Sequence, residues 1–129
     1  MKTKQQNSFS MKARFKSFVY AYNGILVFFK EEHNARIHLF LAVLASCAGF
    51  YFKIDATEWM ALIFAIGFVL ACEAFNSAIE NLCDVISPEQ HSKIGKIKDI
   101  AAGAVLMSAI AALLVGIVIF LPKLWAMCC

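Results

Sequence analysis

The sequence predicts an all-α membrane protein, with an N-terminal amphipathic surface helix followed by three transmembrane helices. The 129-residue chain is 61% hydrophobic and only 16% charged, whereas soluble chains have about 45–50% apolar and about 25% charged residues. A domain of this size buries only about 60–70% of its surface, so the apolar excess must face lipid. Three long apolar runs show where the chain crosses the bilayer, and the length corresponds to one domain, residues 1–129.

The surface helix is expected at residues 11–30, after a flexible segment at 1–10. Within 11–30, apolar side chains recur every three or four residues, as they do on one face of a helix. These apolar residues are Phe15, Phe18, Tyr22, Ile25 and Phe29. Lys12 and Lys16 fall on a different stripe of the same helix. This pattern predicts a helix that lies in the interface with its basic side toward anionic headgroups.

The three apolar runs predict membrane helices over residues 35–52, 56–86 and 98–121. The third contains 22 uncharged residues from 100 to 121, which is enough to cross about 30 Å of hydrocarbon. The first two are joined by only Lys53, Ile54 and Asp55. We therefore expect them to form a tight antiparallel hairpin.

Basic residues predict the orientation of the chain. The N-terminal arm is rich in lysine, and the connection that begins near Ser87 carries Lys93, Lys96 and Lys98. Both segments are expected on the cytoplasmic side, because cytoplasmic loops carry an excess of lysine and arginine. The net charge of +3 is too small to indicate nucleic acid as a partner.

A polar stripe on the second membrane helix is the strongest functional signal in the sequence. At 100° per residue, its five members fall within an arc of about 100°. They are Glu73, Asn76, Ser77, Glu80 and Asp84. A charged side chain near the bilayer centre costs at least about 2.5–3.5 kcal/mol, and three carboxylates on one face repel one another. The stripe therefore indicates a functional site, and a divalent cation is the natural partner for its oxygen atoms.

Other interpretations of the stripe are open at this point. The end of the helix can be a solvated face, most simply at Asp84. The stripe can also belong to an ion or proton pathway, which predicts transport without ATP. A non-enzymatic scaffold subunit is a further alternative, although such a subunit has no need of carboxylates at membrane depth.

Further polar residues flank the membrane helices on the same side. Glu31, Glu32 and Asn34 precede the first membrane helix, while Lys98 and Asp99 open the third. Phosphoryl transfer uses such a set: carboxylates that hold Mg²⁺, a cation against phosphate oxygens, and a carboxylate base near the acceptor hydroxyl. At the interface, an acceptor in lipid can meet a nucleotide that arrives from water. The histidines are expected to be interface or packing residues: His33, His38 and His91.

Three segments of the chain resemble the motifs of a known family. The stripe lies within Glu-Ala-Phe-Asn-Ser-Ala-Ile-Glu-Asn-Leu-Cys-Asp at 73–84; Glu-His-Asn-Ala-Arg-Ile-His at 32–38 precedes it, and Lys-Asp-Ile-Ala-Ala-Gly-Ala-Val-Leu at 98–106 follows it. The segment at 73–84 resembles the ExxNxAIExxxD signature of the small bacterial integral-membrane diacylglycerol kinases and undecaprenol kinases. The other two resemble the flanking motifs of that family in order and spacing. The resemblance covers residues 12–121.

The resemblance implies a homotrimeric helical bundle that phosphorylates a lipid hydroxyl with MgATP, at composite sites between neighbouring subunits. By motif position, Glu73 resembles the catalytic base, and Glu32 and Glu80 resemble the Mg²⁺ ligands. The implied nucleotide-binding residues are Lys16, Tyr20, Asn76, Glu80, Asp84, Lys98 and Asp99. The implied partners are ATP, a membrane lipid alcohol and the bilayer. The implied location is the bacterial inner membrane, with the N-terminus and the active site on the cytoplasmic side.

Two departures from the diacylglycerol kinases bear on the acceptor lipid. Many proteobacterial members have a serine where this chain has Ala102, and an arginine of their surface helix corresponds to Ala13, although Arg14 is adjacent. Loss of polar groups on the acceptor side suits a polyprenol, which has one hydroxyl, better than a glyceride with ester oxygens. We therefore favour undecaprenol as the acceptor, with diacylglycerol as the alternative.

Overall fold

The computed structural model describes residues 10–87 and 91–128, and within these ranges the chain forms four α-helices and no strand. The helices are α1 (Met11–Glu31), α2 (His33–Phe52), α3 (Ala56–Ile86) and α4 (Ser92–Cys128). The expectation of a flexible segment at 1–10 falls, apart from Ser10, outside the described residues. The prediction of an all-α fold with one N-terminal helix and three long apolar helices is confirmed.

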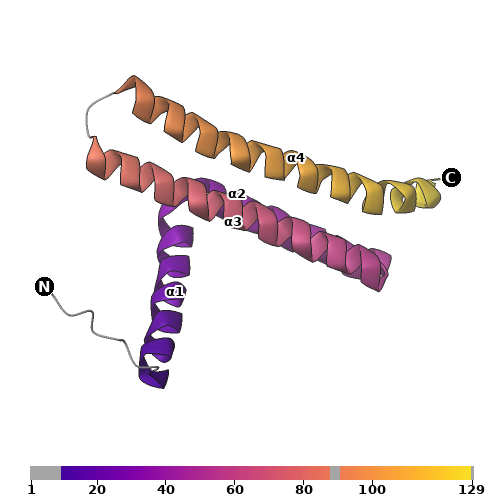
Figure 1. Cartoon of the computed structure of the whole chain (residues 1–129). Coiled ribbons are helices and arrows are strands. Elements are labelled where there is room, and N and C mark those ends of the chain that lie inside the picture. Colours follow the sequence, from indigo (N-terminus) through magenta and orange to yellow (C-terminus); the bar gives the residue numbers. More distant parts are fainter. Residues whose placement is uncertain (1–9, 88–90, 129) are drawn as a thin grey trace, which may run out of the picture.

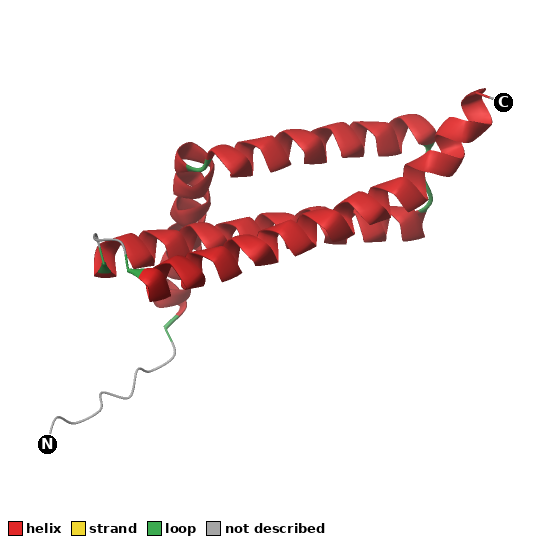
Figure 2. Ribbon diagram, turned by 90° about the horizontal axis from the view of Figure 1, so that it is seen from above, coloured by secondary structure: helices red, strands yellow, loops and turns green. Residues whose placement is uncertain are grey.

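The three long helices run side by side, and α1 projects away from them (Figure 1). The view from above shows α2, α3 and α4 as nearly parallel rods (Figure 2). The break between α1 and α2 is a single residue, Glu32, whose backbone is extended with φ −91° and ψ 115°. This change of backbone conformation gives α1 a direction different from that of α2.

The α2–α3 hairpin is closed by local backbone chemistry. Lys53 ends α2 in the left-handed conformation, with φ 50° and ψ 51°. Asp55 then caps α3: its Oδ1 accepts a hydrogen bond from the Glu58 amide at 2.9 Å, and Glu58 Oε2 accepts one from the Asp55 amide at 3.0 Å. This reciprocal pair satisfies two of the amides that a helix start leaves without partners. The tight turn makes α2 and α3 antiparallel neighbours.

Gly49 allows α2 and α3 to approach closely near this turn. A Cβ atom at position 49 would lie 2.9 Å from a ring carbon of Trp59 and 3.0 Å from Ile54 Cδ1. Ile54 belongs to a small buried core with Leu62 and Ile119. This buried apolar core therefore lies at the hairpin end of the helices.

Helix α4 is longer than the expected membrane helix at 98–121, because it begins at Ser92 and continues to Cys128. Lysine is a good helix former, so the basic segment before residue 98 is helical, and the connection from α3 is correspondingly short. Near its C-terminal end α4 bends (Figure 2), and Pro122 lies inside the helix. Lys123 Nζ in this part donates to Glu58 Oε1 at 2.7 Å, which joins α4 to the start of α3.

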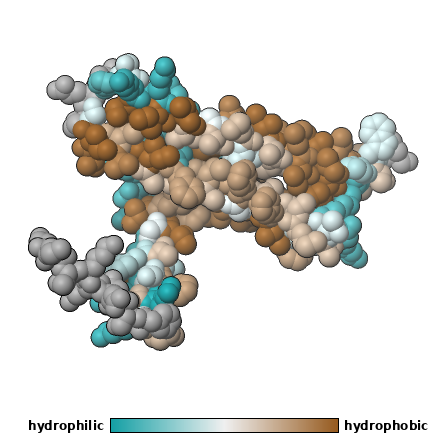
Figure 3. Space-filling model, in the orientation of Figure 1, coloured by the Kyte–Doolittle hydropathy of each residue, from teal (hydrophilic) through white to brown (hydrophobic). Residues whose placement is uncertain are grey.

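The outside of the helical layer is suited to lipid. Large apolar side chains stay exposed along all three long helices, for example Phe40 at 62%, Phe64 at 75% and Val118 at 73%. Hydrophobic residues cover much of the visible face of these helices, and hydrophilic residues gather at their ends and on α1 (Figure 3). The three long helices have the length and hydropathy to cross a membrane. This chain is a membrane protein.

Candidate active site

The predicted site residues meet where the α1–α2 junction contacts the second half of α3. The hydroxyl of Ser77, a buried residue of α3, donates a hydrogen bond of 2.5 Å to Glu32 Oε1 at the junction. Beyond this contact, α3 continues past the start of α2 toward the α3–α4 connection (Figure 1). Ile86, nine residues after Ser77, lies about 14 Å farther along the helix axis. The polar end of α3 thus extends past the α1–α2 junction, where α1 turns away from the three long helices.

Glu73 is the deepest charged residue of the site. It lies one turn before Ser77 on α3 and is only 4% exposed. Its Oε1 is 3.2 Å from His38 Nε2 on α2. The carboxylates of Glu32 and Glu80 are near enough for their negative charges to act on it. Glu73 is therefore a buried acid that has one hydrogen-bonding partner from another helix and two like charges nearby.

Asn76 and Glu80 form the next level of the stripe. Asn76 Nδ2 donates to Glu80 Oε1 at 3.1 Å, across one helical turn. The other polar atom of the amide, Asn76 Oδ1, is buried and accepts no hydrogen bond from any described residue. A buried carbonyl oxygen without a donor is unusual in proteins. It is an available oxygen ligand beside a carboxylate.

The last level is an ion pair between α3 and α4. Lys98 Nζ donates to Asp84 Oδ1 at 2.5 Å, and Glu80 contributes a further negative charge near the same lysine. Asp99, the next residue on α4, is exposed. Glu73 and Asp84 are eleven residues apart, about 16 Å along α3. The stripe therefore runs from a buried carboxyl to an exposed ion pair.

Oxygen atoms of the stripe and of Glu32 are of the type that binds a magnesium ion together with a nucleotide. Mg²⁺ is usually held by one or two carboxylates, while phosphates and waters supply its other ligands. Glu32 and Glu80 offer carboxylate oxygens of this kind, and Asn76 Oδ1 offers a further oxygen atom. Within the described ranges, no group of three or more His, Cys, Asp or Glu side chains is close enough to hold a metal without such help. These oxygen atoms are thus suited to an ion whose other ligands come from phosphates and waters, rather than to a site formed by protein ligands alone.

Two predicted nucleotide-binding residues are not brought to the stripe within one subunit. Lys16 and Tyr20 are exposed on α1, which extends away from the three long helices (Figure 1). The other predicted residues all lie on the stripe, at the α1–α2 junction or at the start of α4.

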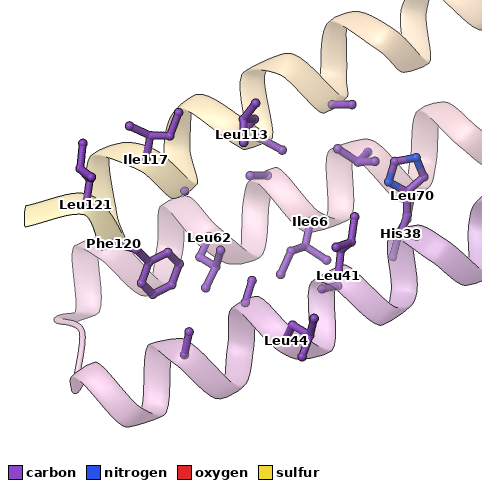
Figure 4. Close-up of a pocket in the computed structure, with 18 of the residues that line it drawn as sticks. His38, Leu41, Leu44, Leu62, Ile66, Leu70, Leu113, Ile117, Phe120 and Leu121 are labelled. Carbon is purple, nitrogen blue, oxygen red and sulfur yellow. The ribbon is translucent and has the colours of Figure 1, made fainter. Parts of the chain in front are cut away.

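An apolar groove leads along the helices toward Glu73. It lies between α2, α3 and α4, has a volume of 590 Å³, and is lined by aliphatic and aromatic side chains with one histidine. Leu41, Ile66 and Leu113 each come from a different helix, and His38 lies at one end of the groove (Figure 4). Pockets for small ligands are commonly about 300–1,000 Å³ in volume. An aliphatic chain in this groove would have its polar end near the His38–Glu73 pair.

The structure shows site contacts of two residues to which the sequence assigned no part in the reaction. Ser77 is on the predicted stripe, but its bond to Glu32 depends on a contact between segments far apart in the chain. His38 was expected to be an interface or packing residue, and its imidazole on α2 contacts Glu73 on α3. The sequence feature that could have indicated the His38–Glu73 contact is the short turn between α2 and α3. Residues at similar distances from that turn face each other in an antiparallel hairpin. His38 and Glu73 satisfy this condition.

The chain is similar to known prokaryotic lipid kinases. Residues 19–120 match the family described as prokaryotic diacylglycerol kinase. The chain is 38% identical over 110 residues to an undecaprenol kinase of Bacillus subtilis, covering 85% of this chain and 89% of that protein. It is 37% identical over 109 residues to a diacylglycerol kinase of Synechocystis, covering 84% of this chain and 62% of the relative. A diacylglycerol kinase of Escherichia coli is 32% identical over 98 residues, or 74% of this chain and 78% of that enzyme.

The helical membrane fold and these relatives define the class: the protein is a membrane lipid kinase, which uses ATP and a lipid alcohol. Within this class, the chain belongs to the prokaryotic diacylglycerol kinase family. The resemblance seen in the three sequence motifs is confirmed.

Proposed function

We propose that this chain transfers the γ-phosphate of MgATP to the hydroxyl of a membrane polyprenol, with undecaprenol as the favoured acceptor. The observation that carries the proposal is the position of Glu73. Its buried carboxyl lies between the apolar groove and a stripe of polar groups that ends in the exposed Asp84–Lys98 pair. A lipid hydroxyl can reach this carboxyl from the groove, and a nucleotide can reach the stripe from water.

In the proposed reaction, Glu73 accepts the proton of the lipid hydroxyl. The hydroxyl oxygen forms a bond to the γ-phosphorus while the bond from that phosphorus to the β–γ bridging oxygen breaks, and ADP leaves. Glu73 then releases its proton to water. A carboxylate is suited to this role because a general base must bind the proton and give it up again at the working pH.

The nucleotide side is assigned to other residues of the stripe together with Glu32 and Lys98. Glu32 and Glu80, with Asn76 Oδ1, would hold the Mg²⁺. When bound, this ion neutralises charge on the phosphate oxygens during transfer. Lys98 supplies a cation for phosphate oxygens, and its bond to Asp84 directs its ammonium group toward the stripe.

The remaining nucleotide-binding residues are Asp99, Lys16 and Tyr20. The two on α1 support a homotrimer, because they are exposed on a helix that projects away from the stripe of its own subunit. In such an assembly, α1 of one subunit completes the nucleotide site of a neighbour. The basic start of α4 supports an orientation with the N-terminus and the site on the cytoplasmic side of the bacterial inner membrane.

The preference for undecaprenol rests on apolar character and similarity. Ala102 lacks the hydroxyl that many diacylglycerol kinases have at this position, and His38 is the one polar residue among those that line the groove. The Bacillus subtilis relative named undecaprenol kinase is 38% identical to this chain. Diacylglycerol is the second candidate, because two relatives that are 37% and 32% identical are named diacylglycerol kinases.

The acceptor is tested with purified protein in mixed micelles that contain Mg²⁺ and γ-labelled ATP. Undecaprenol and diacylglycerol are offered separately and then together at equal mole fraction. We expect label to enter undecaprenol when it is offered alone, and to enter undecaprenol in preference to diacylglycerol when both lipids are present. Preferential labelling of diacylglycerol would refute the polyprenol assignment. No label in either lipid from a correctly assembled protein would refute the kinase mechanism proposed for Glu73.

A further inference from the structure

The hydrogen bond between His38 and Glu73 connects the proposed base to a residue that lines the apolar groove. Nε2 of His38 lies 3.2 Å from Oε1 of Glu73, and the side chains are 22% and 5% exposed. The two residues come from different helices, so the contact depends on the packing of α2 against α3. Hydrogen bonds to charged groups are among the stronger ones in proteins. This contact therefore limits the orientations that the Glu73 carboxyl can adopt.

The surroundings of Glu73 make such a restraint useful. Carboxylates of Glu32 and Glu80 are close enough to repel it, and repulsion alone would favour conformers that point away from the stripe. His38 is placed on the groove side of the carboxyl, since it also lines the groove (Figure 4). The imidazole is thus the polar group that a lipid hydroxyl meets at the end of an otherwise apolar path.

We propose that His38 is a positioning residue for the transfer reaction: its Nε2–H binds one oxygen of Glu73 and fixes the orientation of the carboxyl, so that the other oxygen stays available to accept the proton of the acceptor hydroxyl. This inference rests on the proposed function of Glu73 as the base. His38 takes no proton in the reaction. It acts by keeping the carboxyl in one orientation, and a misplacement of about 1 Å at a reacting group can lower a rate about 100-fold.

The test compares two variants of His38. His38→Leu places an apolar side chain in the groove and removes the donor, whereas His38→Gln supplies an amide N–H donor in its place. We expect His38→Leu to lower kcat about 10–100-fold with the KM for ATP changed by less than about twofold, and His38→Gln to recover most of the loss. A matched control in the groove, Leu41→Ala, should instead raise the KM for lipid. Equal kcat for His38→Leu and wild type, or no recovery in His38→Gln, would overturn the proposal.

A second measurement needs no change at His38. ¹⁵N NMR of the imidazole in the assembled wild-type protein should show a protonated Nε2 whose resonance shifts in the Glu73→Gln variant. An imidazole signal that does not respond to Glu73→Gln would overturn the positioning role, even if the His38 variants fail to assemble. Failure of the proposed function is a separate result, because it is seen as an absence of lipid phosphorylation by the wild-type protein.

Discussion

Replacement of Ser77 by alanine tests whether Glu32 holds the magnesium ion. The change removes the hydroxyl that donates to Glu32 Oε1 at 2.5 Å and leaves a helix-compatible side chain at a buried position. A hydrogen bond to a charged group contributes about 1.5–3 kcal/mol. Because 1.4 kcal/mol corresponds to a factor of ten, we expect the Mg²⁺ concentration for half-maximal activity to rise about 10–100-fold. Groups that orient metal ligands typically have effects of this size.

The assay measures the initial rate of lipid phosphorylation against free Mg²⁺ at saturating lipid and constant ATP. At high Mg²⁺ the rate of Ser77→Ala should approach that of wild type, because the base and the acceptor groove are unchanged. Ser46→Ala is the matched control: its hydroxyl donates to the Ala42 carbonyl at 2.8 Å within α2, away from the stripe. An unchanged Mg²⁺ dependence in Ser77→Ala, or an equal change in Ser46→Ala, would refute the reasoning.

Three further predictions follow from contacts elsewhere in the site and fold. Lys98→Ala should raise the KM for ATP more than it lowers kcat, and Lys98→Arg should retain part of the affinity; a purely kcat effect in steady-state kinetics would contradict the phosphate-binding role. Gly49→Ala should destabilise the protein by about 1–3 kcal/mol through overpacking, whereas Gly67→Ala, which has open space around it, should not; thermal unfolding in detergent compares the two. Glu58→Gln and Lys123→Met should each lower the melting temperature, and the double variant should show less than their sum; additive losses would show that the pair does not interact.

The sequence predicts the helices and the stripe because both depend on local patterns. Apolar runs of sufficient length define the spans, and a spacing of 100° per residue places Glu73, Glu80 and Asp84 on one face of α3. The same reasoning underestimates the length of α4. Its start at Ser92 lies in a basic segment that has no apolar run, yet lysine is a good helix former. Helix formation and membrane depth are therefore separate properties of this segment.

The contacts between helices are not available from such patterns. The bonds from Ser77 to Glu32 and from His38 to Glu73 depend on the rotation and register of α2 against α3, which hydrophobic periodicity only approximates. That Asn76 Oδ1 accepts no hydrogen bond from a described residue can be seen only once the neighbouring side chains are placed. Lys16 and Tyr20 lie on α1 away from the stripe, and only the resemblance to the family motifs points to a part for them in nucleotide binding.

The most direct test of the account is label transfer from γ-labelled ATP to lipid by wild-type protein and by Glu73→Gln. Glu58→Gln is the matched control, because it changes a glutamate of the same helix at the end remote from the stripe. In assays below the lowered melting temperature of Glu58→Gln, where all three proteins are assembled, we predict that wild type and Glu58→Gln phosphorylate the lipid while Glu73→Gln does not. Lipid phosphorylation by Glu73→Gln at the wild-type rate would contradict the role of Glu73 as the base. ATP-independent ion flux that is lost in Glu73→Gln, without any lipid labelling by wild type, would favour an ion pathway instead.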